Sequence, residues 1–340
     1  MSIKEKPVIA VIGATGAVGE AMLSILAERM GTDHQVYAVA SERSFGKTVD
    51  FGRKSLNVEV LDDFDFSNVD FAMFSAGAKI SKKFAPRAAD AGCIVIDNTS
   101  AFRYKDDIPL VVPEVNSEEL ESVGPGSIIA NPNCSTIQLV VAIAPIHRVA
   151  GIDRINIATY QSVSGAGSAG LEELAKQTLA RLTFGEVETR FFRQQIAFNV
   201  LAEIDSVQDN GYTREEMKLQ WETAKILDDK DLKVNATAVR VPVFFGHSEA
   251  VHLETREDVS IEEVEELLNL APGVCVVNDT GEGFATAVTH GAGKDEVFVS
   301  RLRRDHTHPR GINLWVVSDN VRKGSALNTI QIMEVIRKNA

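Results

Sequence analysis

The sequence predicts two domains, an α/β domain followed by an α+β domain. In residues 1–133, short apolar runs alternate with helical patterns, which is typical of a parallel sheet with right-handed crossovers. Beyond residue 150 the apolar runs are longer and favour antiparallel strands with helices on one face. A last helical pattern, Arg322 to Arg337, is expected to return to the first domain and pack against its sheet. We therefore expect domains at 1–133 with 314–340 and at 134–313, joined by a short crossing.

The first strand, Pro7 to Ile12, is a continuous apolar run and is followed by the loop Gly13–Gly19. A helical pattern then covers Glu20 to Met30. Strand, glycine loop and helix together are the context of a dinucleotide site, in which small residues let the backbone approach a pyrophosphate at the helix N-terminus. The spacing is G-x-x-G-x-x-G, and a tight turn without a ligand is the alternative. We predict a Rossmann-type dinucleotide-binding domain.

The remaining elements of the first domain follow in order. We expect strands at Gln35–Ala40, Val49–Phe51, Leu56–Leu61, Val69–Phe74 and Cys93–Ile96, and a helix at Ile80–Ala91. The loop after the last of these strands should face the site, because ligands of open α/β sheets bind beyond the carboxyl ends of the strands. Arg103 in that loop is a candidate anion clamp, or else a solvated surface arginine.

The stretch Asn131–Thr136 carries the candidate nucleophile. It separates an apolar run, Ser127 to Ala130, from a buried helical pattern that begins at Ile137. Asn133 is a good N-cap, which places Cys134 in the first helical turn, where free N–H groups and the helix dipole favour a thiolate. A thiolate there is an activated nucleophile. The alternative is a buried cysteine that serves as a small apolar residue.

The second domain contributes further candidates. We expect strands at Asp153–Val163, Leu232–Val243, Val251–Thr255, Gly273–Val277, Val297–Leu302 and Ile312–Val317, and helices from Leu171 to Leu182, Glu215 to Leu227 and Ser260 to Leu270. A flexible loop is expected at residues 164–170. Gln161 lies near one strand end, and His247 follows the strand that carries Arg240. Glu215 and Lys218 are three residues apart on one helix face, which is also the pattern of an ordinary solvated face.

Composition narrows the class of protein. The net charge of −13 argues against a nucleic-acid surface, and 44% hydrophobic residues is ordinary for a globular protein. Three cysteines are too few and too scattered for a disulfide framework or a four-thiolate zinc site. The N-terminus shows no signal peptide and no apolar run approaches about 20 residues, so we expect a cytoplasmic protein with no membrane partner. His306 and His308 beside Asp305 suggest a surface turn and no metal site.

The dinucleotide loop, the helix-start cysteine and the later histidine together indicate oxidation or reduction of an acyl group through a thioester. The histidine would handle protons. The chain resembles the aspartate-semialdehyde dehydrogenase family over nearly its full length. The motifs that carry the resemblance are Gly13–Gly19, Asn131–Thr136, Gln161–Gly167, Arg240–Val243 with Gly246–Glu249, and Asp319–Asn320 with Arg322–Gly324.

The resemblance implies reductive dephosphorylation of L-aspartyl 4-phosphate by NADPH to aspartate 4-semialdehyde, NADP and phosphate, in the biosynthesis of lysine, threonine, methionine and isoleucine. It implies Cys134 as nucleophile, His247 as acid–base and Gln161 as the group that orients the intermediate. It also implies a homodimer formed by the second domain. The implied substrate-binding residues are Arg103, Asn133, Glu215, Lys218 and Arg240, with Glu216 an alternative to Glu215; the implied cofactor-binding residues are Gly13, Thr15, Gly16, Ala17, Val18, Ser41, Arg43, Ser44, Ser75, Ser164, Gly165 and Asn320.

Other functions are less consistent with the residues. N-acetyl-glutamyl-phosphate reductase or a glyceraldehyde-phosphate dehydrogenase would share the chemistry, but Arg240 with Glu215 favours a free α-amino acid. A non-catalytic dinucleotide-binding module would not need Cys134, His247 and Gln161 together, and a cysteine hydrolase would not need the glycine loop.

The end of the second strand predicts NADP as the cofactor. NAD-specific folds carry an acidic residue there, whereas this strand ends at Ser41 and Arg43 follows two residues later. Serine and arginine side chains both bind a 2′-phosphate. In an extended segment alternate side chains share a direction, so Glu42 should point away if Ser41 and Arg43 face the ligand.

Overall fold

A computed structural model describes residues 5–278, 281 and 283–339 of the chain. It divides into two compact units, the first made of residues up to Asn133 and from Ser325 onward, the second of residues 134–324. The division after Asn133 lies where the sequence places it. The return to the first unit begins at Ser325 and not at residue 314, because Gly311–Ser318 is an inner strand of the second unit's sheet.

The first unit is a seven-stranded sheet in the order β3-β4-β2-β1-β5-β6-β7. All neighbouring pairs are parallel except β3 with β4. The strands are β1 (Ile9–Ile12), β2 (Val36–Ala40), β3 (Thr48–Phe51), β4 (Lys54–Val60), β5 (Phe71–Phe74), β6 (Ile94–Asp97) and β7 (Ile128–Ala130). Every residue of β1, β5 and β6 is buried, which explains why these strands are apolar throughout except for Asp97 at the end of β6.

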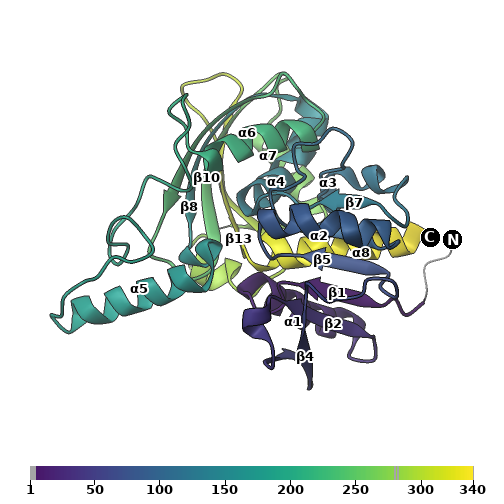
Figure 1. Cartoon of the computed structure of the whole chain (residues 1–340). Helices are drawn as coiled ribbons and strands as arrows, with labels where there is room; N and C mark the ends of the chain where they lie inside the picture. Colours follow the sequence, from purple (N-terminus) through teal and green to yellow (C-terminus); the bar gives the residue numbers. More distant parts are fainter. Residues whose placement is uncertain (1–4, 279–280, 282, 340) are drawn as a thin grey trace. The chain divides into compact units, whose positions relative to one another are not determined.

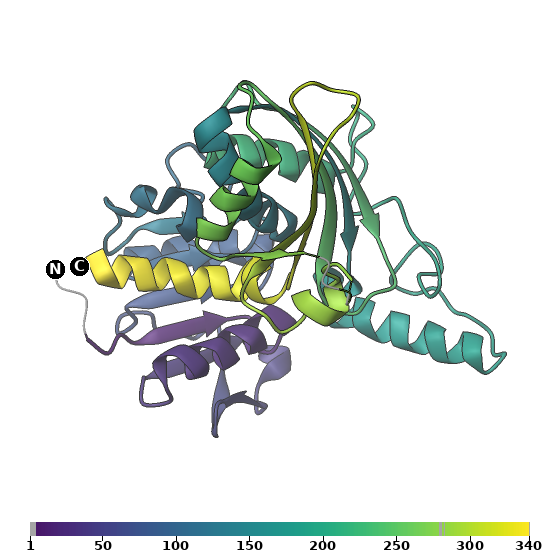
Figure 2. The ribbon, with the colours of Figure 1, turned by 180° about the vertical axis from the view of Figure 1, so that it is seen from behind.

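Helices cover both faces of this sheet. The first-unit helices are α1 (Ala17–Met30), α2 (Ala78–Asp90), α3 (Pro113–Asn116) and α8 (Leu327–Asn339). Apolar side chains of α1 and α8 share one core with the sheet, and α8 lies alongside its strands (Figure 2). The predicted return of the last helix to the first sheet is therefore present. The helix itself begins later than expected, at Leu327, because Arg322–Ala326 forms a π-helical turn.

The second unit is a six-stranded sheet in the order β11-β12-β13-β10-β8-β9. Its strands are β8 (Ile152–Gln161), β9 (Lys233–Arg240), β10 (His247–Thr255), β11 (Val274–Val277), β12 (Val297–Arg304) and β13 (Gly311–Ser318). The sheet is mixed and not antiparallel throughout, since β8 pairs with β9 and β11 with β12 in parallel. Parallel pairs need a crossover, and α6 and the intervening segment supply the one between β8 and β9.

The helices of the second unit are α4 (Cys134–Ala150), α5 (Gly167–Leu182), α6 (Arg214–Ile226) and α7 (Ile261–Leu270). Figure 1 shows α4, α6 and α7 on one side of the long strands, while α5 projects away from them. The residues expected to form a flexible loop, 164–170, are instead helical from Val163 onward. Ser260 caps α7 as predicted, in a capping box with Glu263.

The Asp305–His308 segment is the predicted surface turn, and Asp305 Oδ2 lies 2.8 Å from His252 Nε2. In the described part of the chain, no three His, Cys, Asp or Glu side chains come together as a metal site would require. Nor does any described helix have the length and apolar character needed to cross a bilayer.

Candidate active site

The predicted nucleophile stands at the first residue of α4. Cys134 is half-buried, and α4 continues with an almost entirely buried apolar surface. Free N–H groups of this first turn and the helix dipole favour the thiolate. The segment before α8 passes very close to the cysteine: a Cβ on Gly324 would lie 2.9 Å from Cys134 Cβ. Only glycine fits there, so the backbone at Gly324 limits where the Cys134 side chain can lie.

Gln161 is the last residue of β8 and is 1% exposed. Its Oε1 accepts a hydrogen bond from Thr159 Oγ1 at 3.0 Å, and its Nε2 donates to Glu215 Oε1 at 3.1 Å. Gln161 Nε2 also lies 3.4 Å from His247 Nε2. These contacts hold the amide group in one orientation beside His247.

His247 is the first residue of β10 and is fully buried. The Ser162 backbone N–H donates to its Nδ1 at 3.0 Å, which assigns the remaining proton of the neutral ring to Nε2. Burial, and next the charge of Arg240, lower the pKa of His247 to about 3. The imidazole is therefore neutral near pH 7 and presents an N–H donor on the side of Gln161.

Arg240 is the last residue of β9 and is 7% exposed. Its NH1 donates to the Ser162 carbonyl at 2.7 Å. Burial lowers the pKa of Arg240, whereas Glu215 and then Cys134 act in the opposite direction. Gly165 lies against the same groups, since a Cβ there would be 3.0 Å from Arg240 NH1 and 3.3 Å from His247 Nε2. Arg240, His247 and Gln161 thus converge from three strand ends.

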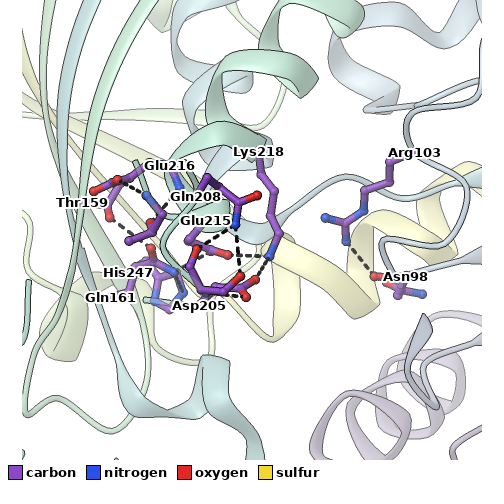
Figure 3. A network of polar contacts seen from close by, with 12 residues as sticks. Asn98, Arg103, Thr159, Gln161, Asp205, Gln208, Glu215, Glu216, Lys218 and His247 are labelled. Carbon is purple, nitrogen blue, oxygen red and sulfur yellow. Dashed lines mark hydrogen bonds and ion pairs between the residues drawn. The ribbon is translucent and has the colours of Figure 1, made fainter. Parts of the chain in front are cut away.

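The start of α6 separates the roles of two adjacent glutamates. Glu216 accepts from the Thr213 backbone N–H at 2.7 Å in a capping box, and its other oxygen accepts from the Ala238 N–H at 2.9 Å. Both of its oxygens therefore serve the fold. Glu215 is directed to Gln161 and to Lys218 instead (Figure 3). The structure thus favours Glu215 over Glu216 as the acidic group of the site.

Lys218 forms a bridge between two carboxylates. Its Nζ donates to Glu215 Oε2 at 2.8 Å and to Asp205 Oδ2 at 3.0 Å (Figure 3). Burial alone would lower the pKa of Lys218, but Glu215 and Asp205 together raise it. Sequence reasoning missed Asp205, which lies in an irregular segment with a φ of 68° and belongs to no motif. A positively charged, half-buried amine held by Glu215, which also accepts from Gln161, suits an anionic group.

A second polar cluster lies behind His247. Asn320 Oδ1 accepts hydrogen bonds from Ser162 Oγ at 3.0 Å, Ser164 Oγ at 3.1 Å and the Gly246 N–H at 3.0 Å. Ser162 Oγ lies 3.1 Å from His247 Nδ1, so this cluster orients the histidine. Ser162 was not singled out from the sequence, although it lies within the Gln161–Gly167 motif. Ser164 and Asn320, predicted to bind the cofactor, thus also hold the loop beside His247.

In the first unit, the glycine loop connects β1 to α1, which begins at Ala17, earlier than predicted, so that Ala17 and Val18 are helical. A Cβ on Gly19 would lie 2.2 Å from the Gly13 carbonyl oxygen, so the loop can close only around glycine. Ser75 Oγ donates to the Ile12 carbonyl at 3.1 Å and borders the loop. Gly16 is exposed at the start of α1, where backbone N–H groups suit a pyrophosphate.

The segment after β2 differs from its prediction. Glu42–Ser44 is one turn of 3₁₀-helix with Ser41 at its N-terminus, so successive side chains do not alternate as in a strand. Ser44 is buried, and its Oγ lies 3.2 Å from Thr15 Oγ1 in the glycine loop. Ser41, Glu42 and Arg43 are all exposed. The assumption that this segment is extended was therefore wrong, and the direction of Glu42 does not follow from strand alternation.

Two predicted substrate-binding residues also belong to the first unit. Arg103 is 6% exposed, and its NH2 donates to the Asn98 carbonyl at 2.7 Å (Figure 3). Arg103 is therefore buried and fixed by a hydrogen bond, and it is not a solvated surface arginine. Asn133 is 8% exposed. These two lie in the first unit, whereas Cys134, Gln161, Glu215, Lys218, Arg240 and His247 lie together in the second.

Comparison with known proteins gives concordant results for both units. Residues 8–123 match the family model described as semialdehyde dehydrogenase, NAD binding domain, and residues 143–323 match semialdehyde dehydrogenase, dimerisation domain. The chain is 53% identical to the aspartate-semialdehyde dehydrogenase of Legionella pneumophila over 97% of this chain and 95% of the relative. It is 54% identical to aspartate-semialdehyde dehydrogenase 2 of Vibrio cholerae over 96% of this chain and 97% of the relative. A crystal structure of aspartate semialdehyde dehydrogenase II from Vibrio cholerae, complexed with ASA, superposes with a TM-score of 0.95 at 53% identity, covering 98% of this chain and 99% of that one.

Proposed function

The chain belongs to the aspartate-semialdehyde dehydrogenase family, and from this premise we propose how its residues carry out the family's reaction. The reaction is the NADPH-dependent reductive dephosphorylation of L-aspartyl 4-phosphate to L-aspartate 4-semialdehyde, a step in the biosynthesis of lysine, threonine, methionine and isoleucine. The observation that carries the proposal is the convergence of Cys134, Gln161 and His247 in one unit, with Arg240, Glu215 and Lys218 around them.

The nucleophilic step uses Cys134 as a thiolate. The sulfur attacks the acyl carbon, a C–S bond forms, and the C–O bond to phosphate breaks with its electron pair leaving on phosphate. Stabilisation of the thiolate comes from the start of α4 and from the positive charge of Arg240. When bound, NADPH would supply a hydride. Release of the aldehyde then breaks the C–S bond, and its electron pair returns to the sulfur of Cys134.

His247 and Gln161 act on the oxygen of the reacting carbonyl. His247 is neutral and carries its proton on Nε2, because Nδ1 already accepts the Ser162 N–H. That proton is available to the developing oxyanion, and Gln161 Nε2 offers a second donor 3.4 Å away. Two fixed donors at the oxygen stabilise the transition state more than the ground state.

Each charged group of the substrate is proposed to bind a side chain of opposite charge in the site. The Arg240 guanidinium binds the α-carboxylate, and Glu215 binds the α-ammonium group. Lys218, held by Glu215 and Asp205, and Arg103 bind the phosphate. Asn133, which directly precedes Cys134 in the sequence, would contribute its side-chain amide to substrate binding. A free amino acid suits Arg240 and Glu215 together, whereas an acetylated substrate has no ammonium group to offer Glu215.

The chain uses NADP, and the residues of the first unit suit a dinucleotide. The pyrophosphate would lie on Gly13, Thr15, Gly16, Ala17 and Val18 at the start of α1, bordered by Ser75, while Ser41, Arg43 and Ser44 would bind the 2′-phosphate. The remaining predicted contacts come from Ser164, Gly165 and Asn320. We also propose a homodimer formed through the second unit, and a cytoplasmic location in keeping with three free cysteines.

Assay of the reverse reaction tests the proposal. Aspartate semialdehyde should reduce NADP only when inorganic phosphate is added, and NADPH should form in equal amount to the semialdehyde consumed. N-acetyl-glutamate semialdehyde is the matched control, and we expect negligible activity with it. Comparable rates with the acetylated substrate, or reduction of NADP that does not depend on phosphate, would contradict the proposal.

A further inference from the structure

Glu249 is a buried carboxyl group that the proposed mechanism does not use. It lies on β10, is 0% exposed, and neither of its oxygens makes a hydrogen bond with the described residues. The polar side chain that faces it is Gln138, which is also 0% exposed and, within the described part of the chain, makes no well-formed hydrogen bond. Burial of polar groups without hydrogen bonds costs folding free energy, so the presence of two complementary ones side by side needs an explanation.

Gln138 and Glu249 lie on the same two elements as Cys134 and His247, each a few residues further along the chain. Side chains alternate along a strand, so Glu249 lies on the same face of the sheet as His247, two residues earlier. Gln138 is four residues after Cys134 in α4, hence one turn along the same helix face. Cys134 and Gln138 on the helix therefore correspond to His247 and Glu249 on the sheet.

Glu249 also adjoins the support of Gln161. The strand register pairs Glu249 with Thr159 on β8 and with Val316 on β13. Thr159 is the residue whose hydroxyl fixes the Gln161 amide at 3.0 Å. Glu249 is therefore connected to each of the three groups that act on the acyl carbon. His247 lies two residues earlier on the same strand, and Thr159, which holds Gln161, is the cross-strand neighbour of Glu249. Gln138 lies one helical turn after Cys134.

Among the described residues, no charged group contributes to the shift in the pKa of Glu249. Its helix neighbour Gln138 and its cross-strand neighbours Thr159 and Val316 are uncharged. Burial raises the pKa of Glu249 well above its ordinary value, and Gln138 offsets this only partly. The raised pKa favours the protonated form of Glu249 over the carboxylate. A protonated carboxyl group and a primary amide are complementary, because the acid O–H can donate to the amide oxygen while the amide N–H donates to the acid carbonyl.

We propose that Glu249 and Gln138 form a positioning pair that sets the distance between the start of α4, which carries Cys134, and the sheet edge that carries Gln161 and His247. This inference rests on the proposed function for its catalytic consequence. A side chain at Glu249 that cannot hydrogen-bond would let α4 shift against the sheet, and a displacement of about 1 Å at a reacting atom costs about 10²-fold in rate. An amide at position 249 would still pair with Gln138.

Three variants test the proposal. Glu249→Gln should keep kcat within about threefold, because it preserves an uncharged hydrogen-bonding group of the same shape. Glu249→Met and Gln138→Met should each lower kcat by about 10–100-fold with little change in KM. The midpoint of urea unfolding should fall in each single methionine variant, because the remaining partner is left buried and unpaired, and should recover in the double methionine variant, in which both partners are replaced. Glu254→Met, on the same strand but on the opposite face, should behave as wild type.

Alkylation of Cys134 by iodoacetamide gives a readout that needs neither substrate nor cofactor. The pH profile of the alkylation rate should be the same in wild type and Glu249→Gln, and shifted to higher pH in Glu249→Met and Gln138→Met. A profile shifted to lower pH in Glu249→Gln would show that Glu249 is ionised and would overturn the proposal. So would wild-type kcat and wild-type alkylation in both methionine variants. Failure of the proposed function would instead appear as wild-type protein that lacks phosphate-dependent turnover while its Cys134 alkylates normally.

Discussion

The residues proposed to act on the acyl group are mostly buried, whereas those proposed to bind the cofactor's 2′-phosphate are mostly exposed. Gln161, Arg240 and His247 stand at strand ends of the second unit, and each is at least nine-tenths buried with fixed partners. Ser41 and Arg43 stand on an exposed 3₁₀ turn of the first unit. The buried groups derive their strength from desolvation and fixed orientation, whereas the exposed ones act through water at high dielectric. Substitutions should therefore have large effects in the first set and small ones in the second.

The largest effect is expected at the nucleophile. Cys134→Ala should lower turnover by at least about 10⁴-fold, because no other described group can form the thioester. Binding of NADP should remain nearly unchanged, since Cys134 acts on the acyl group and not on the cofactor. Intact-protein mass spectrometry during wild-type turnover should detect an acyl adduct on Cys134. Retention of full activity in Cys134→Ala would exclude the thioester route.

His247→Asn should lower kcat by about 10²–10³-fold, the range for loss of one fixed donor to a developing oxyanion. It should also change the pH dependence of stability. Because the pKa of His247 is about 3 in the folded chain and near 6.5 when unfolded, the folded state binds fewer protons between these values. Stability therefore rises with pH across this window and is lost as pH falls. Urea unfolding at pH 7 and pH 5 should show a smaller loss in His247→Asn than in wild type, and an equal loss would contradict the low pKa.

Gln161 could be placed near a strand end because the apolar run of β8 stops close to it, whereas Arg240 was expected inside a strand that in fact ends there. Cys134 at the start of α4 follows from Asn133 and the apolar run after it. The 3₁₀ turn at Glu42–Ser44 was not predictable, since three polar residues fit a turn and an extended strand equally well. Asp205 gave no signal because its partner Lys218 is distant in sequence. The start of β10 at His247 was missed because Gly246 and the polar residues after it do not form an apolar run.

Glu215 and Glu216 allow a comparison inside one helix turn. Glu215→Ala should raise KM for aspartate semialdehyde by about 10–100-fold, because a charge-assisted hydrogen bond contributes about 1.5–3 kcal/mol. Glu216→Ala should leave KM nearly unchanged and lower the free energy of unfolding by about 1–3 kcal/mol, because the buried Ala238 N–H loses its acceptor and α6 loses its capping box. Steady-state kinetics and urea unfolding of both variants measure this. A reversed pattern would assign the acidic group of the site to Glu216.

The smallest effect is expected at Arg43. An exposed guanidinium that binds the 2′-phosphate should add about tenfold to kcat/KM for NADP, the scale of a solvent-screened charge-assisted contact. Arg43→Ala should lose that factor with NADP and almost nothing with NAD, which has no 2′-phosphate. The loss should shrink at high salt, because screening weakens exposed charge pairs but not the buried groups of the second unit. Arg53→Ala removes another exposed arginine, from the turn between β3 and β4, and serves as the control. Equal losses with NADP and NAD would show that Arg43 does not contact the 2′-phosphate, and Ser44, held 3.2 Å from Thr15, would then be the residue of this turn to test next.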